Sequence, residues 1–303
     1  MFDVVIPTYN NLDELKNCLE GFESQTFKDF KVFVCVDGST DGTLEFLESA
    51  NYSFEMQFLT HENNSHKGRN ETRNLAMESL KNEYLLLFDS DIIPENNLLE
   101  KHFNLLREKD CISVGEIIYD NANENIWAKY LQTRGKGKFG DLREMPAFYL
   151  NTQNVALRTK YYIDSGGQDR EISKSYGGDD TELGYRLGKL YGLSAIFNKS
   201  AAGHSIMVKS LSKALQQMEE FGGRNLGLIR KLNPEFREVF NFNFIEDKSL
   251  SKVLFRFLLR EDIADLLKTA VNFAPGFLTI RFVHFLVFYS IYKGYSSGIK
   301  NDR

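Results

Sequence analysis

The sequence predicts an α/β fold centred on a doubly wound, mostly parallel sheet flanked by helices, with a helical extension at the C-terminal end. Three observations carry this prediction. Short apolar runs alternate with amphipathic runs from residue 1 to about 95, and turn formers and acids follow the apolar runs. After residue 205 the sequence is rich in aromatic residues at helical spacing. Alternating strand and helix signals are typical of parallel sheets, because parallel strands need long crossover connections.

The first 95 residues predict four strands and three helices. Apolar residues recur at Leu12, Leu15, Leu19 and Phe22, which is the spacing of one helix face. Asp41 can cap a helix that begins at Thr43. The expected strands are residues 4–6, 31–36, 54–60 and 84–88, and the expected helices are residues 12–25, 43–49 and 68–79.

The remaining chain divides near residue 205. Before that point the pattern is mixed, and after it helical periodicity dominates. Residues 277–295 are very aromatic but contain Arg281, His284 and Lys293, so they are too short and too charged for a confident membrane span. The further expected elements are helices at 98–107, near 179, 221–232 and 250–273, strands at 112–118 and 147–157, and a basic glycine-rich loop at 134–138.

Composition limits the function classes. The net charge of −5 gives no general electrostatic reason to bind nucleic acid. Cys18, Cys35 and Cys111 are scattered without zinc-site spacing, which favours a reducing compartment such as the cytoplasm. No basic leader precedes the first expected strand, so the sequence leaves open a protein without a signal peptide and a piece cut from a longer chain.

Polar residues follow the apolar strands where those strands end. The four segments are Pro7–Asn10, Asp37–Gly42, Lys67–Asn74 and Asp89–Asp91. Ligands bind at the carboxyl ends of strands in open α/β sheets, so these segments should converge on one crevice. Two acids one residue apart can face a divalent cation and the ribose of a nucleotide. Taken singly, each motif has an ordinary alternative: a capping acid in a turn, or a solvated helix arginine.

Together these segments, in this order and approximate spacing, resemble the family 2 glycosyltransferases, which have the Rossmann-like GT-A fold. The resemblance covers residues 1 to about 205. It implies a catalytic domain at 1–205, with a nucleotide-binding half at 1–95 and an acceptor-binding half at 96–205, followed by a helical region at 206–303. It also implies a nucleotide-sugar donor, with UDP the favoured nucleotide, and a Mn²⁺ or Mg²⁺ ion.

The resemblance assigns roles on the donor side of the site. Asp37 would recognise the base and Arg73 would lie near the base and diphosphate. Asp91 would bind the metal ion with Asp89, and His204 would be a further ligand, although a lone histidine can equally be structural. The donor-binding residues implied by the resemblance are Pro7, Thr8, Tyr9, Asp37, Arg73, Asp89 and Ser90.

Two adjacent acids, Asp179 and Asp180, open a predicted helix after two glycines. Alone they could be an ordinary acidic helix start. The resemblance implies that Asp180 is the general base and that Asp179 is either a support for it or an acceptor contact, although which acid does the chemistry stays open. It also makes Asn154 the expected acceptor contact. Trp127, the one tryptophan, could stack on a sugar or pack in the core.

We therefore expect an inverting hexosyltransferase that moves a sugar from a UDP-sugar to a hydroxyl of a glycan. The acceptors left open are a surface polysaccharide, a lipid-linked intermediate and a glycoprotein glycan. A catalytically silent scaffold that binds nucleotide sugars or carbohydrate is the alternative. A nucleotidyltransferase is disfavoured, because Pro7–Asn10 stands where a glycine-rich basic loop would follow the first strand. For the C-terminal helices we expect packing and homo-oligomerisation, with peripheral contact at the inner face of the cell membrane as an alternative.

Overall fold

The computed structural model describes residues 1–133, 139–235 and 249–301, so the expected basic loop at 134–138 lies outside the described residues. The chain forms two compact units. The first, which we call the sheet unit, comprises Met1–Asp120, Arg134–Ser173 and Asp179–Ile206. The second, the helical unit, comprises Asn121–Thr133, Lys174–Gly178 and Met207–Arg303. Two short segments from within the expected first domain thus belong to the helical unit.

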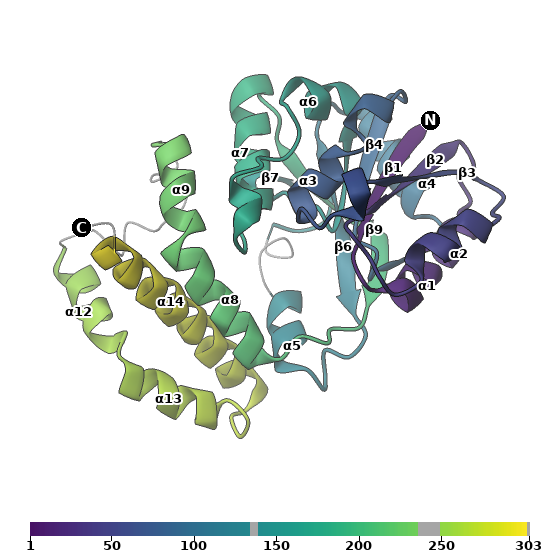
Figure 1. The fold of residues 1–303 in the computed structure, drawn as a ribbon. Coiled ribbons are helices and arrows are strands. Elements are labelled where there is room, and N and C mark those ends of the chain that lie inside the picture. The colour runs from purple at the N-terminus through teal and green to yellow at the C-terminus, as the bar shows by residue number, and fades with distance from the viewer. Residues whose placement is uncertain (134–138, 236–248, 302–303) are drawn as a thin grey trace. The chain divides into compact units, whose positions relative to one another are not determined.

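The sheet unit is built on a mixed sheet with the strand order β3-β2-β1-β4-β8-β6-β9-β5 (Figure 1). The first four strands in this order are parallel. β8 is antiparallel to both of its neighbours, and β9 is parallel to β6. The predicted α/β class and the mostly parallel sheet are confirmed. The strands are β1 (Phe2–Thr8), β2 (Phe30–Val36), β3 (Glu55–Thr60), β4 (Tyr84–Phe88), β5 (Ile93–Pro94), β6 (Ile112–Tyr119), β7 (Glu144–Met145), β8 (Asn154–Arg158) and β9 (Ala195–Ser205).

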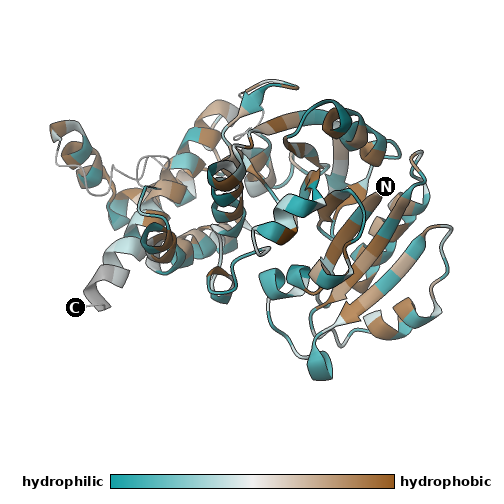
Figure 2. Cartoon of the chain, turned by 90° about the horizontal axis from the view of Figure 1, so that it is seen from above, coloured by the Kyte–Doolittle hydropathy of each residue, from teal (hydrophilic) through white to brown (hydrophobic). Residues whose placement is uncertain are grey.

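The central strands read as continuous apolar runs because both of their faces are covered. Every residue of β4 is buried, and β1 and β2 are buried over nearly their whole length. In Figure 2, strands near the N-terminus are largely brown, the colour of hydrophobic residues. Cys18, Cys35 and Cys111 are buried free thiols in this core. The α-helices of the unit are α1 (Leu12–Glu23), α2 (Thr43–Ser49), α3 (Arg69–Asn74), α4 (Leu98–Glu108), α6 (Thr159–Asp164) and α7 (Asp179–Tyr191).

Two predicted elements of this unit are shorter than expected. The helix predicted at 68–79 is α3 followed by a separate 3₁₀ turn, Met77–Ser79. The strand predicted at 147–157 begins only at Asn154, because Ala147–Tyr149 is a 3₁₀ turn. The apolar residues of that turn pack against α7, where Gly184 lies so close to the Ala147 carbonyl that a Cβ would be 2.2 Å from its oxygen. They are therefore core residues without being strand residues.

In its described residues, the helical unit contains α5 (Ile126–Gln132), α8 (Leu211–Gly223), α9 (Asn225–Leu232), α12 (Leu250–Leu258), α13 (Glu261–Ala270) and α14 (Gly276–Asn301). The backbones of α8 and α14 approach closely, since a Cβ at Gly294 would lie 1.9 Å from the Glu219 carbonyl oxygen. The predicted helix at 221–232 is in fact the end of α8 and then α9, and the predicted helix at 250–273 is α12 and α13.

The aromatic stretch at 277–295 packs inside the helical unit. Val283, Leu286 and Val287 of α14 are buried in one apolar cluster with residues of α5, α8 and α13. The partly buried rings Phe282, Phe285 and Phe288 pack against the same cluster. Among the described residues, no helix combines the length and the apolar character that crossing a membrane requires. The aromatic richness of this stretch is therefore explained largely by packing.

Candidate active site

The loops that follow β1, β2 and β4 are tied together by side-chain hydrogen bonds. The backbone N–H of Asn10 donates to Ser39 Oγ at 3.1 Å, and the N–H of Thr40 donates to Asn10 Oδ1 at 2.8 Å. Asn11 Nδ2 donates to Ser90 Oγ at 2.8 Å. Three of the four polar segments predicted from the sequence therefore meet at the carboxyl ends of neighbouring parallel strands, where such sheets bind ligands.

Asp37 joins the remaining segment, Lys67–Asn74, to the other three. Its buried carboxylate accepts hydrogen bonds from the backbone N–H groups of Lys67, at 2.7 Å, and Gly68, at 3.0 Å. Nδ1 of His66 lies 3.0 Å from the same carboxylate. The backbone of residues 64–66 comes so close to residue 38 that only glycine fits there. Its φ is +78°, and a Cβ would lie 2.8 Å from the backbone nitrogen of His66. Asp37 thus fixes the loop that leads into α3, and its role toward the base stays a prediction.

The segment after β1 forms one wall of this region. Pro7 is the partly exposed partner of Cys35 in the sheet, and Thr8 is buried with its hydroxyl donating to Asn11 Oδ1 at 2.5 Å. The ring of Tyr9 is exposed and lies 4.4 Å from the His66 ring, centroid to centroid. An exposed aromatic ring with a second ring beside it is a surface on which a base can stack.

Arg73 is a buried arginine of α3, with 2% of its surface exposed. Its Nη2 donates to Asp89 Oδ1 at 2.5 Å, and its Nη1 donates to Gln168 Oε1 at 3.5 Å. Its Nε makes no hydrogen bond to any described residue. A buried guanidinium is costly unless it is paired, so the alternative of a solvated helix arginine is wrong. The Nε atom is itself buried, so its unsatisfied N–H is a cost of this arrangement and is not exposed to a ligand.

The acids after β4 differ in exposure. Asp89 is partly exposed beside Arg73, whereas Ser90 is buried and accepts the hydrogen bond from Asn11. Asp91 is exposed. Burial raises the pKa of the Cys18 thiol well above its ordinary value, and the negative charges of Asp91 and Asp89 raise it further. Both carboxylates therefore lie close to the same core position, at the end of β4.

Asp179 and Asp180 begin α7, as predicted. Asp180 Oδ1 accepts a hydrogen bond from the Thr152 hydroxyl at 2.5 Å. Burial raises the pKa of Asp180 to about 6, and the Asp179 charge acts in the same direction, while the charge of Arg73 opposes both. Asp179 is itself buried and lies 3.4 Å from Arg69 Nη2.

Arg73 connects the two halves of the site. It is hydrogen-bonded to Asp89 at the end of β4, and its positive charge lowers the pKa of Asp180 at the start of α7. Arg69 belongs to the same helix and lies 3.4 Å from Asp179, so α3 lies against acids from both halves of the sequence. The sheet unit thus brings together residues that are about ninety positions apart in the chain.

His204 lies on β9, opposite Ile93 of β5. Its Nδ1 is 2.8 Å from Asp120 Oδ1 and its Nε2 is 3.4 Å from Glu95 Oε1. The hydrogen bond with Asp120 is the main reason that the pKa of His204 is raised. Within the described parts of the chain, no three His, Cys, Asp or Glu side chains are grouped to hold a metal ion. Both nitrogens already face carboxylates, so a role as metal ligand stays a prediction.

Asp91 nevertheless suits one kind of metal site. Mg²⁺ and similar hard cations bind through one or two carboxylates and complete their shell with phosphate oxygens and water. An exposed carboxylate beside Asp89 provides hard oxygen donors for a cation that the diphosphate of a ligand also holds. The residues present therefore fit a cation that binds together with its substrate.

The two predicted acceptor contacts need correction. Asn154 is completely buried, its Oδ1 lies 2.9 Å from His102 Nε2, and its Nδ2 donates to the Ala201 carbonyl at 2.9 Å. It stands inside the sheet as the first residue of β8 and offers no atom to an acceptor. Trp127 is only 3% exposed and packs with Tyr130 in the core of the helical unit, so the core-packing alternative applies.

Two residues at the site were not predicted. Thr152 lies in the turn before β8, and its hydroxyl bonds to Asp180. Gln168 is buried, and its backbone is held by Asn74, which donates from Nδ2 to the Gln168 carbonyl at 2.8 Å. The pair Gly166–Gly167 was the available signal, since a Cβ at Gly167 would lie 2.4 Å from Asn74 Oδ1. Consecutive glycines mark such a close approach.

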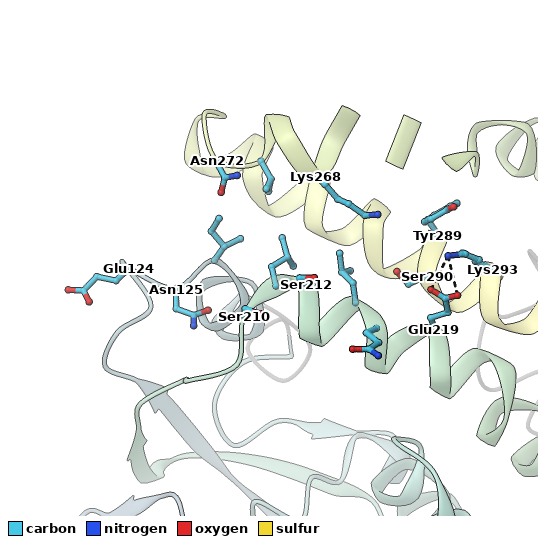
Figure 3. Close-up of a pocket in the computed structure, with 15 residues that line it drawn as sticks. Glu124, Asn125, Ser210, Ser212, Glu219, Lys268, Asn272, Tyr289, Ser290 and Lys293 are labelled. Carbon is cyan, nitrogen blue, oxygen red and sulfur yellow. Dashed lines mark hydrogen bonds and ion pairs between the residues drawn. The ribbon is translucent and has the colours of Figure 1, made fainter. Parts of the chain in front are cut away.

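A separate groove of about 610 Å³ lies within the helical unit (Figure 3). It is lined by residues of α8, α13, α14 and the start of α5, including Glu219, Lys268 and Lys293. Both lysines are paired, Lys293 with Glu219 at 3.2 Å and Lys268 with Asp265 at 2.9 Å. The groove contains no residue predicted for the site.

Comparison with known proteins identifies the family. The sequence model described as Glycosyl transferase family 2 matches residues 3–167. Glycosyltransferase GlyG of Streptococcus pneumoniae is 28% identical over 129 residues, which are 42% of each chain. The uncharacterized glycosyltransferase YfnE of Bacillus subtilis is 35% identical over 235 residues, covering 61% of this chain and 59% of YfnE. The chain thus spans less than two thirds of the length of these relatives.

Solved structures show the fold. A mannosyltransferase from Pyrobaculum calidifontis in complex with GDP-Man and Mn²⁺ superposes with a TM-score of 0.62 at 15% identity, covering 96% of this chain and 86% of that one. Staphylococcus aureus TarS 1–349 in complex with UDP-GlcNAc gives 0.55 at 16% identity, covering 99% and 91%. These matches confirm the predicted GT-A fold. Because the family model covers more than half of its residues, the chain belongs to glycosyl transferase family 2.

Proposed function

We propose that the chain is an inverting glycosyltransferase that moves a hexose from a nucleotide-diphosphate sugar to a hydroxyl of a glycan, with Asp180 as the general base. The observation that carries this proposal is the arrangement around Arg73. This residue is hydrogen-bonded to Asp89 on the expected donor side, and Arg69 of the same helix lies 3.4 Å from Asp179, the neighbour of Asp180. A donor held at Asp89 and an acceptor activated at Asp180 would therefore meet at one place.

Asp180 has the properties of a general base. A base works best when its pKa lies near the working pH, and the pKa of Asp180 is raised to about 6. At neutral pH the carboxylate is mostly ionised and can still accept a proton readily. The Thr152 hydroxyl holds Oδ1, which orients the carboxylate. Asp179 is buried against Arg69, so it suits a supporting role better than that of the base.

The donor side offers a complementary set of groups. Tyr9 provides an exposed ring for a base, and Arg73 holds the Asp89 carboxylate in place on the donor side. Asp91, with Asp89 beside it, would hold a Mn²⁺ or Mg²⁺ ion. When bound, such a cation stabilises the charge that develops on the leaving diphosphate. UDP is the proposed nucleotide, by the resemblance noted above and by the UDP-GlcNAc bound to TarS.

The reaction needs no covalent intermediate. Asp180 would take the proton from the acceptor hydroxyl, and the hydroxyl oxygen would bond to the anomeric carbon as the bond to the diphosphate breaks. Attack from the face opposite the leaving group inverts the anomeric centre. The chain's own contribution is to orient the two substrates and to hold the proton at Asp180, which are the effects that favour a direct displacement.

A panel of UDP- and GDP-sugars, each with Mn²⁺ or Mg²⁺, tests the proposal. Donor hydrolysis identifies the sugar, and thermal shift measures donor binding. Asp91→Asn should remove the metal-dependent part of the thermal shift. Asp164→Asn, at an exposed acid of α6, is the matched control and should leave it unchanged. Donor binding with no turnover of any donor, with or without glycan acceptors, would show that the chain is a silent binding scaffold.

A further inference from the structure

Arg186, near the middle of α7, joins that helix to the loop that follows α6. Its Nε donates to Glu182 Oε1 at 2.8 Å and its Nη2 to Glu182 Oε2 at 2.9 Å. The same guanidinium donates to two backbone carbonyls, those of Ser165 at 2.6 Å and Gly167 at 2.8 Å. The Glu182 side chain is 4% exposed and that of Arg186 21%, so these bonds are largely shielded from water. Arginine suits such a set of fixed partners because its donors form a rigid planar fork.

The loop that Arg186 holds is also held by α3. Asn74 Nδ2 donates to the Gln168 carbonyl at 2.8 Å, and Asn74 Oδ1 accepts from the Gln168 N–H at 3.0 Å. Asn70 Nδ2 donates to the carbonyl of Asp169, the next residue, at 2.8 Å. Residues 165–169, which we call the bridge loop, are thus hydrogen-bonded to α7 through their first residues and to α3 through their last.

The bridge loop has little freedom to take another shape. Gly166 and Gly167 both have positive φ, +84° and +70°, which glycine adopts readily. The N–H of Gly167 donates to the carbonyl of Tyr162 in α6 at 2.9 Å, and the side chain of Gln168 is buried. Since its backbone groups are bonded to three helices, a shift of one of these helices is resisted by the other two.

The two helices that the bridge loop joins, α3 and α7 (Figure 1), carry different parts of the site. α3 carries Arg73 on the donor side, and α7 begins with Asp179 and Asp180. Arg186 lies six residues after Asp180, about 9 Å along the helix, so its bonds act on the position of α7 and not on the reacting atoms. Arg69 of α3 lies 3.4 Å from Asp179, but its side chain is 52% exposed, so this pair alone holds the helices weakly.

We propose that Arg186 is a positioning residue for the transfer step: through the bridge loop it fixes α7, and with it Asp180, relative to the donor side carried by α3. The inference rests on the proposed function, because it concerns the placement of the proposed base. α7 also packs on the core of the sheet unit through Leu183 and Leu187. Apolar contacts are non-directional, however, whereas hydrogen bonds fix both a distance and an angle.

The variant Arg186→Met tests the positioning role. It releases α7 from the bridge loop, while α3 still holds that loop and the donor side. The affinity for UDP with Mn²⁺, measured by calorimetry, should therefore stay within about twofold, whereas transfer at saturating substrates should fall roughly tenfold or more. Arg186→Lys keeps a positive charge beside Glu182 but cannot bond to the carboxylate and both carbonyls as a fork, so it should restore stability more than rate.

Asp3→Asn is the matched control for a general loss of stability. Asp3 is buried at the amino end of β1, away from the site, and accepts hydrogen bonds from the N–H groups of Lys81 and Asn82 at 2.7 and 2.9 Å. This variant should unfold more easily than the wild type and transfer sugar at the same rate. A wild-type rate in Arg186→Met or Arg186→Lys would overturn the proposal, and so would an equal loss of rate in Asp3→Asn.

A double-mutant cycle tests the bridge loop without catalysis. If Arg186 and Asn74 act through the same loop, Arg186→Met combined with Asn74→Ala should lower the urea midpoint of unfolding by clearly less than the sum of the two single losses. Arg186→Met combined with Asp3→Asn should be additive. Additive losses in the first pair would overturn the proposal. Coupled losses together with a wild type that transfers no sugar from any donor would refute the proposed function alone, and the bridge loop would stand.

Discussion

Replacing Thr152 by valine removes a single hydrogen bond to the proposed base while keeping the shape of the side chain. The Thr152 hydroxyl donates to Asp180 Oδ1 at 2.5 Å, and this bond lowers the pKa of Asp180. A hydrogen bond to a charged acceptor contributes about 1.5 kcal/mol or more, and about 1.4 kcal/mol corresponds to a tenfold change in proton affinity. The valine variant should therefore have a higher pKa at Asp180, by about one pH unit.

The pH dependence of kcat/KM measures this effect. Asp180 must be ionised to accept a proton, so the wild-type rate should fall as the pH drops through about 6. In Thr152→Val the same fall should begin about one pH unit higher. At pH 6 the variant should be several-fold slower, and above pH 8 the two enzymes should converge unless orientation also matters. Thr152→Ser keeps the hydroxyl and is the matched control.

One result would refute the reasoning. If Thr152→Val shows both the acidic limb and the plateau rate of the wild type, then the group that titrates in the rate is not Asp180. A uniform loss of rate with an unmoved limb would indicate that Thr152 orients the carboxylate without setting its proton affinity. The measurement needs only a donor and an acceptor that turn over, and its outcome does not depend on which hexose is transferred.

Three further predictions concern the site and its surroundings. Arg73→Met should weaken nucleotide binding by tenfold or more in calorimetry, because Asp89 loses the partner that holds its carboxylate; unchanged affinity would remove Arg73 from the donor site. Trp127→Phe should lower the free energy of unfolding by about 1–3 kcal/mol while leaving donor affinity unchanged, because the ring packs in the helical unit; a loss of acceptor binding at full stability would contradict this. The pKa of His204 is raised in the folded protein, so its pairing with Asp120 stabilises the fold below pH 6.5, and this contribution disappears as the pH rises through the folded pKa. Because the pair is partly exposed, the unfolding free energies of wild type and His204→Gln should differ by less than about 1 kcal/mol at acidic pH and converge at alkaline pH; a difference that grows with pH would contradict the assignment.

The sequence was most informative where strands are buried on both faces. Residues 84–88 form a continuous apolar run, and β4 has the predicted boundaries because such a run leaves few alternatives. The same kind of signal was misleading at 147–157, where the apolar residues of the first turn pack on α7 and do not enter the sheet. Periodicity reports that a residue is buried, but it does not report against which element.

The residues of the site also divide into those that the sequence indicated and those that it did not. Asp37, Arg73, Asp89 and Asp180 were singled out by the joint order of several segments that resemble a known family, since each segment alone has an ordinary alternative; their roles in the reaction stay predictions. Thr152 could not be singled out, because its importance comes from a partner 28 residues away. The prediction that Asn154 contacts the acceptor was wrong, because the sequence does not show where the turn ends and β8 begins. Thr152 lies just outside the sheet and faces Asp180, whereas Asn154 lies inside it.

The most direct test of the account is the rate of sugar transfer by Asp180→Asn, measured together with donor affinity. Amide replaces carboxylate with little change in volume, so the donor should bind as tightly as it does to the wild type, while transfer should fall by about 10²-fold or more. Near wild-type transfer by this variant would contradict the assignment of Asp180. A large loss of donor affinity with normal transfer at saturating donor would contradict it equally.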